Sequence, residues 1–335
     1  MTTPVIQRHD LGPPGSLTEL GRGGEGVVFD VTARPGTVFK EYLPRTGLVL
    51  RRDALERLVA LPARMSASDQ RVLASRTAWP TALVIDGARL AGYLMPRIPD
   101  IYWRTHGARH DPRHVVCDWN FLAYRQQWSG SEAIVSDVPR ATGRQALELV
   151  MDLARTMRIL HRYDLVMGDV SGRNLLWTDK PEPRVFVIDC DAFRPEGGDA
   201  VCPSKESPEW DDPEVSGSRT TRASDVYKLG LAAYRAIWAA SAKRPTGDLQ
   251  LPEGVPDALA DLVRRSVRPS GRPSAREWVD QLATALRFEG RPVVRIDAAR
   301  RPGPGSDGPP TGPIAVTPTP RKEQPPGGRP VIPTG

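Results

Sequence analysis

Two short polar segments in the middle of the chain carry side chains suited to activating a hydroxyl group beside a metal ion. Residues 165–176 read LVMGDVSGRNLL, which places Asp169 five residues before Asn174. Fifteen residues after Asn174, the apolar run VFVI ends in Asp189-Cys190-Asp191. A carboxylate can take a hydroxyl proton, and the oxygens of asparagine and aspartate are ligands that Mg²⁺ prefers. The spacing predicts proton abstraction next to a divalent cation, held by Asn174 and by Asp189 or Asp191.

A glycine-rich stretch near the N-terminus suits phosphate binding. Residues 20–28 read LGRGGEGVV, which fits G-x-G-x-x-G-x-V with Gly21, Gly23, Gly26 and Val28. Glycines let the backbone approach a phosphate closely, although the same pattern also fits a plain hairpin turn. Both flanks look like strands, which favours a flap over the strand-to-helix turn of dinucleotide-binding folds.

Lys40 follows fourteen residues after Gly26, at the end of an apolar strand. The chain has 46 lysines and arginines, of which only six are lysines, so a chance match at this spacing is less common. A compact ammonium group there can pair with the α- and β-phosphates of a nucleotide. The next predicted helix offers Glu56 as the carboxylate that orients Lys40, and Asp53 is the competing candidate one turn earlier.

Hydrophobic patterning gives the elements that must position these residues. Residues 16–96 are mostly strand-like with one helix at about 50–65, and helices dominate from 97 onward. The strongest amphipathic helix covers 144–162, two strand-like runs follow at 174–177 and 185–189, and further helices are predicted at 223–241, 257–267 and 274–287. His106, His110 and His114 recur every fourth residue, but Pro112 interrupts the run and argues against a metal-binding helix face.

Composition restricts the class of protein. Apolar residues make up 39% of the 335 residues, the net charge is +6, and the three cysteines have no disulfide or zinc spacing. Residues 291–335 hold 12 of the 34 prolines and +4 of the net charge, so we expect a disordered tail that can bind a partner. Residues 1–15 are expected to be a loose lead-in. We expect a cytoplasmic protein that neither spans a membrane nor binds nucleic acid.

The ordered set of motifs resembles the protein-kinase superfamily over residues 16–290. The resemblance implies an α+β bilobal fold with a small β-rich N-lobe (16–96) and a larger helical C-lobe (97–290), and it implies ATP with Mg²⁺ or Mn²⁺. Asp169 would be the catalytic base, Arg173 would lie near the γ-phosphate, and Asn174 and Asp189 would hold metal. Lys40 and Glu56 would position the phosphates. The nucleotide would contact Gly21, Gly23, Gly26, Val28, Val38, Met95 and Leu176.

Three later segments also resemble this family. Residues 207–214 read SPEWDDPE, residues 223–230 read ASDVYKLG, and residues 271–274 read GRPS. By resemblance, these segments build a platform for peptide substrates, and Glu214 pairs with Arg272 in a buried ion pair. They argue against a phosphotransferase acting on small molecules, which would share only the nucleotide-binding residues.

The chain departs from the family pattern at two motifs. Met167-Gly168 replaces His-Arg before the catalytic aspartate, and Asp189-Cys190-Asp191 replaces Asp-Phe-Gly. This mixture is most similar to a divergent bacterial group whose members are often associated with phosphatases and von Willebrand factor A proteins. We expect a Ser/Thr protein kinase acting on protein substrates, including itself. Alternatives are a nucleotide-binding pseudokinase and, less favoured, a small-molecule phosphotransferase. Sites considered for phosphorylation are Ser204, Ser207, Thr317 and Thr319.

Overall fold

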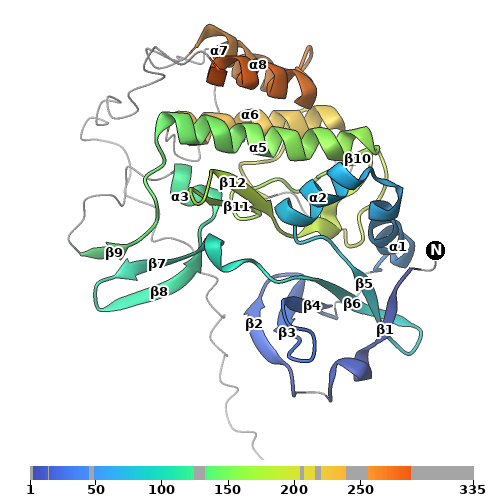
Figure 1. Cartoon of the computed structure of the whole chain (residues 1–335). Coiled ribbons are helices and arrows are strands. Elements are labelled where there is room, and N and C mark those ends of the chain that lie inside the picture. The colour runs from blue at the N-terminus through green and yellow to red at the C-terminus, as the bar shows by residue number, and fades with distance from the viewer. Residues whose placement is uncertain are drawn as a thin grey trace, which may run out of the picture.

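The computed structural model shows a mixed α+β chain in which a six-stranded sheet adjoins a helix-rich region (Figure 1). It describes residues 3–13, 15–44, 49–123, 133–203, 207–215, 220–238 and 256–287. The predicted tail at 291–335 lies outside the described residues, as do Ser204, Thr317 and Thr319.

The sheet has the strand order β1-β5-β6-β4-β3-β2. β1 runs parallel to β5, and the other neighbours are antiparallel. The strands are β1 (Val5–Gln7), β2 (Thr18–Arg22), β3 (Gly26–Asp30), β4 (Thr37–Tyr42), β5 (Ala82–Asp86) and β6 (Arg89–Pro96). The expectation of a loose lead-in at 1–15 was wrong for residues 5–11, which form β1 and the short helix η1 (Arg8–Leu11), with Leu11 buried against the sheet.

Strand β4 alternates between the two faces of the sheet, as a period of two requires. Val38 and Tyr42 belong to the large buried cluster shared with the helices, whereas Phe39 faces a smaller cluster on the opposite side. Lys40 lies between Val38 and Tyr42 on the same face as both. The alternation therefore turns the ammonium group of Lys40 inward, toward the helix-rich region.

Two helices connect β4 to β5. The helix expected at 50–65 is present as α1 (Arg52–Ala60) followed by the 3-10 turn η2 (Leu61–Arg64). Helix α2 (Ala67–Arg76) was not predicted, because its sequence is largely polar and only Asp69 and Leu73 are buried. Its start is nevertheless marked by Ser66, whose hydroxyl caps the Asp69 amide.

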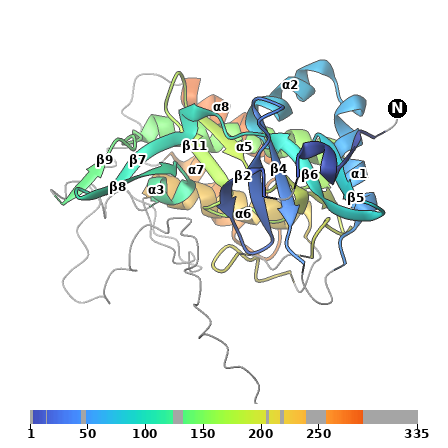
Figure 2. The same cartoon turned by 90° about the horizontal axis from the view of Figure 1, so that it is seen from below.

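The helix-rich region is built on α5 (Gly143–Arg162), whose first turn is closed by a capping box of Thr142 and Gln145. α5 packs along α6 and α8, and the sheet lies on its other side (Figures 1 and 2). The remaining helices of the described residues are α3 (Trp119–Ala123), α6 (Arg222–Trp238), α7 (Asp257–Ser266) and α8 (Ala275–Arg287). None of the helices that the structure describes is long and apolar enough to cross a membrane.

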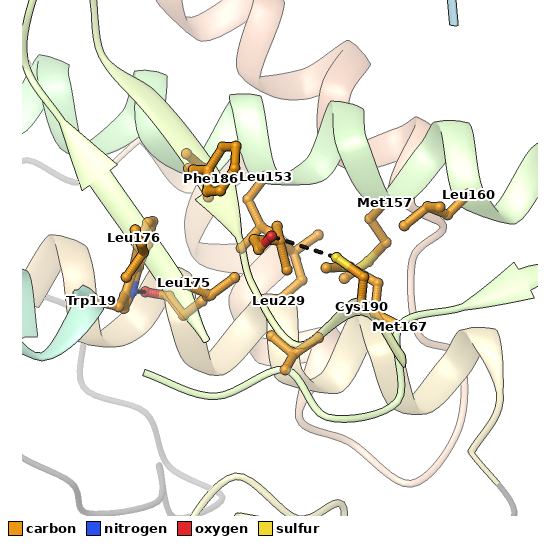
Figure 3. Packing of buried hydrophobic residues seen from close by; sticks show 14 of the residues in the cluster. Trp119, Leu153, Met157, Leu160, Met167, Leu175, Leu176, Phe186, Cys190 and Leu229 are labelled. Atoms are coloured by element: carbon orange, nitrogen blue, oxygen red, sulfur yellow. Dashed lines mark hydrogen bonds between the residues drawn. The ribbon is translucent and has the colours of Figure 1, made fainter. Parts of the chain in front are cut away.

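Two small antiparallel pairs frame the segments that carry the candidate chemistry. β11 (Leu175–Thr178) pairs with β12 (Arg184–Val187), and β10 (Leu165–Val166) pairs with β13 (Arg194–Pro195). The 3-10 turn η4 (Cys190–Ala192) lies between them. Met167 and Cys190 are buried in the main cluster, where the Cys190 thiol donates to the Val187 carbonyl at 3.5 Å (Figure 3).

Residues 103–116 form a hairpin, although helices were expected to dominate from residue 97 onward. After the 3-10 turn η3 (Asp100–Tyr102), strands β7 (Trp103–Ala108) and β8 (Asp111–Val116) pair with each other, and β7 also pairs with β9 (Ile134–Ser136). The three histidines therefore share no helix face. His106 is buried against the Phe121 ring, and His114 stacks on Trp103.

Candidate active site

Asp169 receives hydrogen bonds on both carboxylate oxygens. Nδ2 of Asn174 donates to Oδ2 at 3.0 Å and to the Asp169 backbone carbonyl at 2.9 Å. The hydroxyl of Ser207, which comes from the segment resembling an activation segment, donates to Oδ1 at 3.0 Å. The structure thus joins Asp169 to Asn174, as their spacing predicted, and adds a serine hydroxyl directed at the same carboxylate.

Helix α6 fixes the backbone that leads into Asp169. The buried carboxylate of Asp225 accepts the amides of Met167 at 2.8 Å and Gly168 at 3.2 Å, and it contacts Nε2 of His161 at 3.0 Å. The Lys228 ammonium group, also fully buried, donates to the Gly168 carbonyl. The buried helix expected at 223–241 is present as α6 over the described residues 222–238, and it anchors the segment that carries Asp169 through charged side chains.

Position 168 excludes any side chain. Its φ is 73°, in the left-handed region that favours glycine, and a Cβ there would lie 2.9 Å from Nη1 of Arg194. The buried Arg194 guanidinium thus packs over the position that the family pattern gives to an arginine before the aspartate, but it reaches that place from β13.

Lys40 bridges the sheet to the segment that follows β12. Its Nζ lies 3.1 Å from Oδ1 of Asp189, and 2.9 and 3.1 Å from the two carboxylate oxygens of Asp191. Lys40 is only 5% exposed. Burial alone would lower the pKa of Lys40, but the charges of Asp189 and Asp191 raise it well above its usual value, so the group is an ammonium ion.

Asp191 lies at the centre of a buried cluster. The hydroxyl of Tyr42 donates to its Oδ2 at 2.9 Å, and that of Tyr93 donates to its Oδ1 at 2.9 Å. Burial opposes ionisation, yet Lys40 and the two hydroxyls hold the pKa of Asp191 below its usual value. Burial and the nearby negative charge raise the pKa of both tyrosines well above the ordinary range, so both remain hydrogen-bond donors.

Asp189 differs from Asp191 in exposure. Its side chain is 46% exposed, and its backbone takes a left-handed conformation with φ of 55°. The Ile188 amide donates to the Asn174 carbonyl at 3.0 Å, so the segments carrying Asn174 and Asp189 are adjacent.

The predicted pairing of Lys40 with Glu56 was wrong. Among the described residues, Lys40 forms ion pairs with Asp189 and Asp191, while Glu56 accepts a hydrogen bond from Arg52 at 2.9 Å, one turn earlier on α1. The Glu56 side chain is 39% exposed. The competing candidate, Asp53, pairs with Arg57 in the same i,i+4 manner. Both carboxylates of α1 are therefore engaged on its own surface.

The predicted nucleotide contacts fall on the sheet and on β11. Val38 is opposite Met95, and Val28 is opposite Lys40, in neighbouring strands. Val38, Met95 and Leu176 are buried in the main cluster, and Val28 packs against it. Leu176 is fully buried, and Figure 3 draws it with Leu175, the residue before it on β11.

The three glycines of the flap have different surroundings. A Cβ on Gly26 would lie 2.7 Å from the Glu41 carbonyl, so strand packing requires that glycine. A Cβ on Gly21 would meet nothing within 4 Å, and one on Gly23 would only touch the Gly26 carbonyl at 4.0 Å. Packing within the described chain does not explain the glycines at 21 and 23.

Glu25 adds a negative charge inside this flap. Its carboxyl interacts electrostatically with Lys40, Asp189 and Asp169. Burial raises the pKa of Glu25 above its usual value. The charge of Lys40 opposes this rise, and the negative charges of the neighbouring aspartates add to it. Sequence reasoning did not single out this residue.

Arg173 is exposed, one residue before Asn174, and its charge acts on Asp118, which precedes α3. The Asp118 carboxylate accepts the Asn120 amide at 2.9 Å. Burial raises the pKa of Asp118 to about 7, with Arg173 and the hydrogen bonds opposing that rise.

The predicted ion pair of Glu214 with Arg272 was also wrong, by two residues. Arg272 makes a two-pronged contact with Asp212, including Nη2 to Oδ1 at 2.9 Å, and both side chains are buried. Glu214 is exposed, and its amide donates to Asp212. The contact between the two segments was predicted correctly, but Asp212 supplies the carboxylate.

Comparison with known proteins adds an independent finding. Over 184 residues, 52% of this chain, the sequence is 26% identical to a protein named "Protein kinase YegI" from Escherichia coli O157:H7. Over 192 residues, 54% of the chain, it is 27% identical to the protein of the same name from Escherichia coli strain K12. The chain is a distant relative of named protein kinases. No protein-family model matches it.

The aligned part covers 23% and 24% of those two relatives, so this chain matches about a quarter of their length. The distant relationship and the mixed α+β structure together support a kinase-like protein.

Proposed function

We propose that this chain is an ATP- and Mg²⁺-dependent protein kinase that transfers the γ-phosphate to serine and threonine hydroxyls, with Mn²⁺ able to replace Mg²⁺. The observation that carries the proposal is the serine hydroxyl of Ser207, which donates to Asp169 at 3.0 Å while Asn174 holds the other carboxylate oxygen. A hydroxyl directed at a fixed carboxylate is the geometry that proton removal requires.

The residues present fit a nucleotide and a divalent cation. Because Nδ2 of Asn174 faces Asp169, its Oδ1 is left to coordinate, and the half-exposed Asp189 offers carboxylate oxygens. Gly21 and Gly23 leave open space over the flap that packing does not use. Backbone amides in such a flap suit phosphate oxygens.

Each side chain has one role in this proposal. The bound nucleotide and metal supply the phosphoryl group and part of the charge stabilisation. Asp169 orients the acceptor hydroxyl and takes its proton. Lys40 holds the phosphates, and Arg173 adds positive charge near the transferred group. We propose that residues 16–96, with most of the sheet, and residues 97–290, with most of the helices, form two lobes that enclose these residues. Most of the acceleration then comes from positioning and electrostatics.

A pseudokinase that binds nucleotide without efficient transfer is the second candidate. The observation that favours it is Met167-Gly168 in place of the family's His-Arg. The peptide-platform segments, now joined through Arg272 and Asp212, favour both of these candidates over a small-molecule phosphotransferase. By family resemblance we also propose phosphatases or von Willebrand factor A proteins as partners, with the 291–335 segment available to bind one and no role for nucleic acid.

Labelled ATP separates the candidates. The full chain, with Mg²⁺ or Mn²⁺ and casein as acceptor, is compared with Asp169→Asn and with Asp111→Asn, an exposed aspartate of β8. We expect transfer to fall by a factor of about 100 or more in Asp169→Asn and to persist in Asp111→Asn. Phosphoamino-acid analysis should find phosphoserine or phosphothreonine.

Equal transfer by wild type and Asp169→Asn would contradict the proposed role of Asp169. A rise in melting temperature with ATP and metal, without any transfer, would establish the pseudokinase instead. Phosphotyrosine as the sole product would contradict the proposed acceptor class.

A further inference from the structure

The carboxylate that holds Lys40 belongs to the turn after β12. Lys40 Nζ contacts both oxygens of Asp191, at 2.9 and 3.1 Å, whereas the carboxylates of helix α1 bond to arginines of the same helix. We infer that Asp191 is the residue that positions Lys40 for the nucleotide phosphates, and that Glu56 has no part in it. The inference rests on the proposed function for the identity of the ligand, but not for the ion pair itself.

Asp191 is built to stay in place. Each carboxylate oxygen receives two donors: Oδ1 receives Lys40 and the Tyr93 hydroxyl, and Oδ2 receives Lys40 and the Tyr42 hydroxyl. The Asp191 side chain is 3% exposed. A buried carboxylate that accepts from Lys40 and from two tyrosine hydroxyls is strongly held, because removing these donors leaves an uncompensated charge away from water.

The sheet register explains why these donors meet at one point. Tyr42 lies two residues after Lys40 on the same face of β4, and Tyr93 is directly opposite Lys40 on β6. Three adjacent side chains of the sheet therefore converge on Asp191, which comes from a segment 151 residues further along the chain than Lys40.

Asp189 contacts the same ammonium group but cannot serve as its anchor. It offers one oxygen to Lys40 at 3.1 Å, and its side chain is about half exposed. A metal ion that takes Asp189 would leave Lys40 still held by Asp191. The two aspartates thus have separate tasks, with Asp189 left for the metal and Asp191 occupied by Lys40 and the tyrosines.

Glu56 has the properties of a surface residue. Its side chain is 39% exposed, and its partner Arg52 is 44% exposed. Exposed i,i+4 pairs of this kind contribute little to stability and fix little in place. Glu148, which pairs with Arg144 on α5 in the same way, supplies a matched control.

Nucleotide affinity provides the first test. Binding of ATP, ADP and adenosine is measured by calorimetry for wild type, Asp191→Asn, Glu56→Gln and Glu148→Gln. For Asp191→Asn we expect about tenfold or greater weakening for ATP and ADP and unchanged binding of adenosine, which has no phosphate. The two glutamine variants should match wild type. A structural role alone would weaken all three ligands together and would overturn the inference, as would ATP weakening in Glu56→Gln with none in Asp191→Asn.

If Asp191→Asn does not fold, Tyr42→Phe combined with Tyr93→Phe replaces it. This variant keeps the carboxylate but removes two of its donors, so we expect a smaller loss for ATP and ADP, again without a change for adenosine. Unchanged ATP and ADP binding in the double phenylalanine variant would overturn the inference that Asp191 positions Lys40.

The second test needs no nucleotide. Urea unfolding of Lys40→Met, of Asp191→Asn and of the combined variant gives a double-mutant cycle for the pair. For that cycle we expect clear coupling, whereas the equivalent cycle of Lys40→Met with Glu56→Gln should show none. Absence of coupling between positions 40 and 191 overturns the inference. Coupling in a protein that binds no nucleotide supports the ion pair and rejects the proposed function.

Discussion

The Ser207 hydroxyl donates to Oδ1 of Asp169 at 3.0 Å, across 38 residues of chain. We predict that Ser207→Ala lowers kcat by about tenfold, because a hydrogen bond to a charged group is lost and the carboxylate gains rotational freedom. The KM for ATP should not change, since within the described residues Ser207 bonds to Asp169 and not to Lys40. Steady-state kinetics check this, with Ser207→Thr, which keeps the hydroxyl, expected to recover most of the activity. A Ser207→Ala protein with normal kcat contradicts the role.

Arg272 and Asp212 form a buried pair with side-chain exposures of 6% and 0%. Asp212→Ala should lower the free energy of unfolding by about 3–5 kcal/mol, because the Arg272 charge loses its partner away from water. Glu214→Ala should leave it nearly unchanged, since Glu214 is exposed. Urea denaturation of both variants measures the difference. A larger loss in Glu214→Ala would restore the original pairing.

Gly92 on β6 faces the backbone of Lys40. A Cβ there would lie 1.9 Å from the Lys40 carbonyl, so Gly92→Ala should push β4 away and lower the free energy of unfolding by about 2 kcal/mol or more.

Gly21→Ala meets no atom within 4 Å and should keep the wild-type melting temperature while weakening ATP binding. Thermal denaturation and calorimetry read the two effects. Normal ATP affinity in Gly21→Ala would remove the flap from the phosphate site.

Glu25 places negative charge where the phosphates are proposed to bind. Glu25→Gln should strengthen ATP binding by about threefold to tenfold, because a like charge is removed. Since the pKa of Glu25 is raised, lowering the pH neutralises it sooner than an ordinary glutamate, and the advantage of Glu25→Gln should shrink as pH falls. Calorimetry at several pH values measures this, with Glu19→Gln on the same hairpin as control. An advantage that grows toward acid pH would refute it.

Asp118 should make stability fall with rising pH. The unfolded chain releases this proton near pH 3.9, whereas burial raises the pKa of Asp118 to about 7 in the folded protein. Between about pH 4 and pH 7 the folded state therefore binds more protons than the unfolded chain. The contribution of Asp118 to the free energy of unfolding is complete near pH 4 and is lost as pH approaches 7. Asp118→Asn should remove that decline. Urea midpoints of both proteins across this window decide it, and parallel curves would contradict the assignment.

Local patterns predicted the parts of the molecule that depend on neighbouring residues. The strands at β3 to β6 and the helices α5 to α8 follow from alternation and helical periodicity, and the spacing of Asp169 and Asn174 brought those side chains together. Helix α2 was not predicted because its few buried residues form no apolar stripe, and β7 and β8 were not predicted because polar residues interrupt both strands.

Partners distant in the sequence were harder to assign. Glu56 is near Lys40 in the chain, but Asp191 is the carboxylate that contacts it, and no local pattern reports a contact across 151 residues. The spacing left Asp189 and Asp191 as alternative metal ligands. In the structure the Asp189 side chain is half exposed, whereas the Asp191 side chain is buried. Tyr42 carried a usable signal, since it lies on the same strand face as Lys40. At the other ion pair, Asp212 and Glu214 were both available two residues apart.

Asp191 connects the sheet to the segment that follows β12. Tyr42, Tyr93 and Lys40 belong to the sheet, while Asp191 follows β12, so one buried charged cluster fastens the two regions together. Displacing α1 would leave this fastening intact, and opening the sheet from the helices would first have to expose the cluster to water. Separating the two regions would therefore leave the charges of Lys40 and Asp191 without their partners.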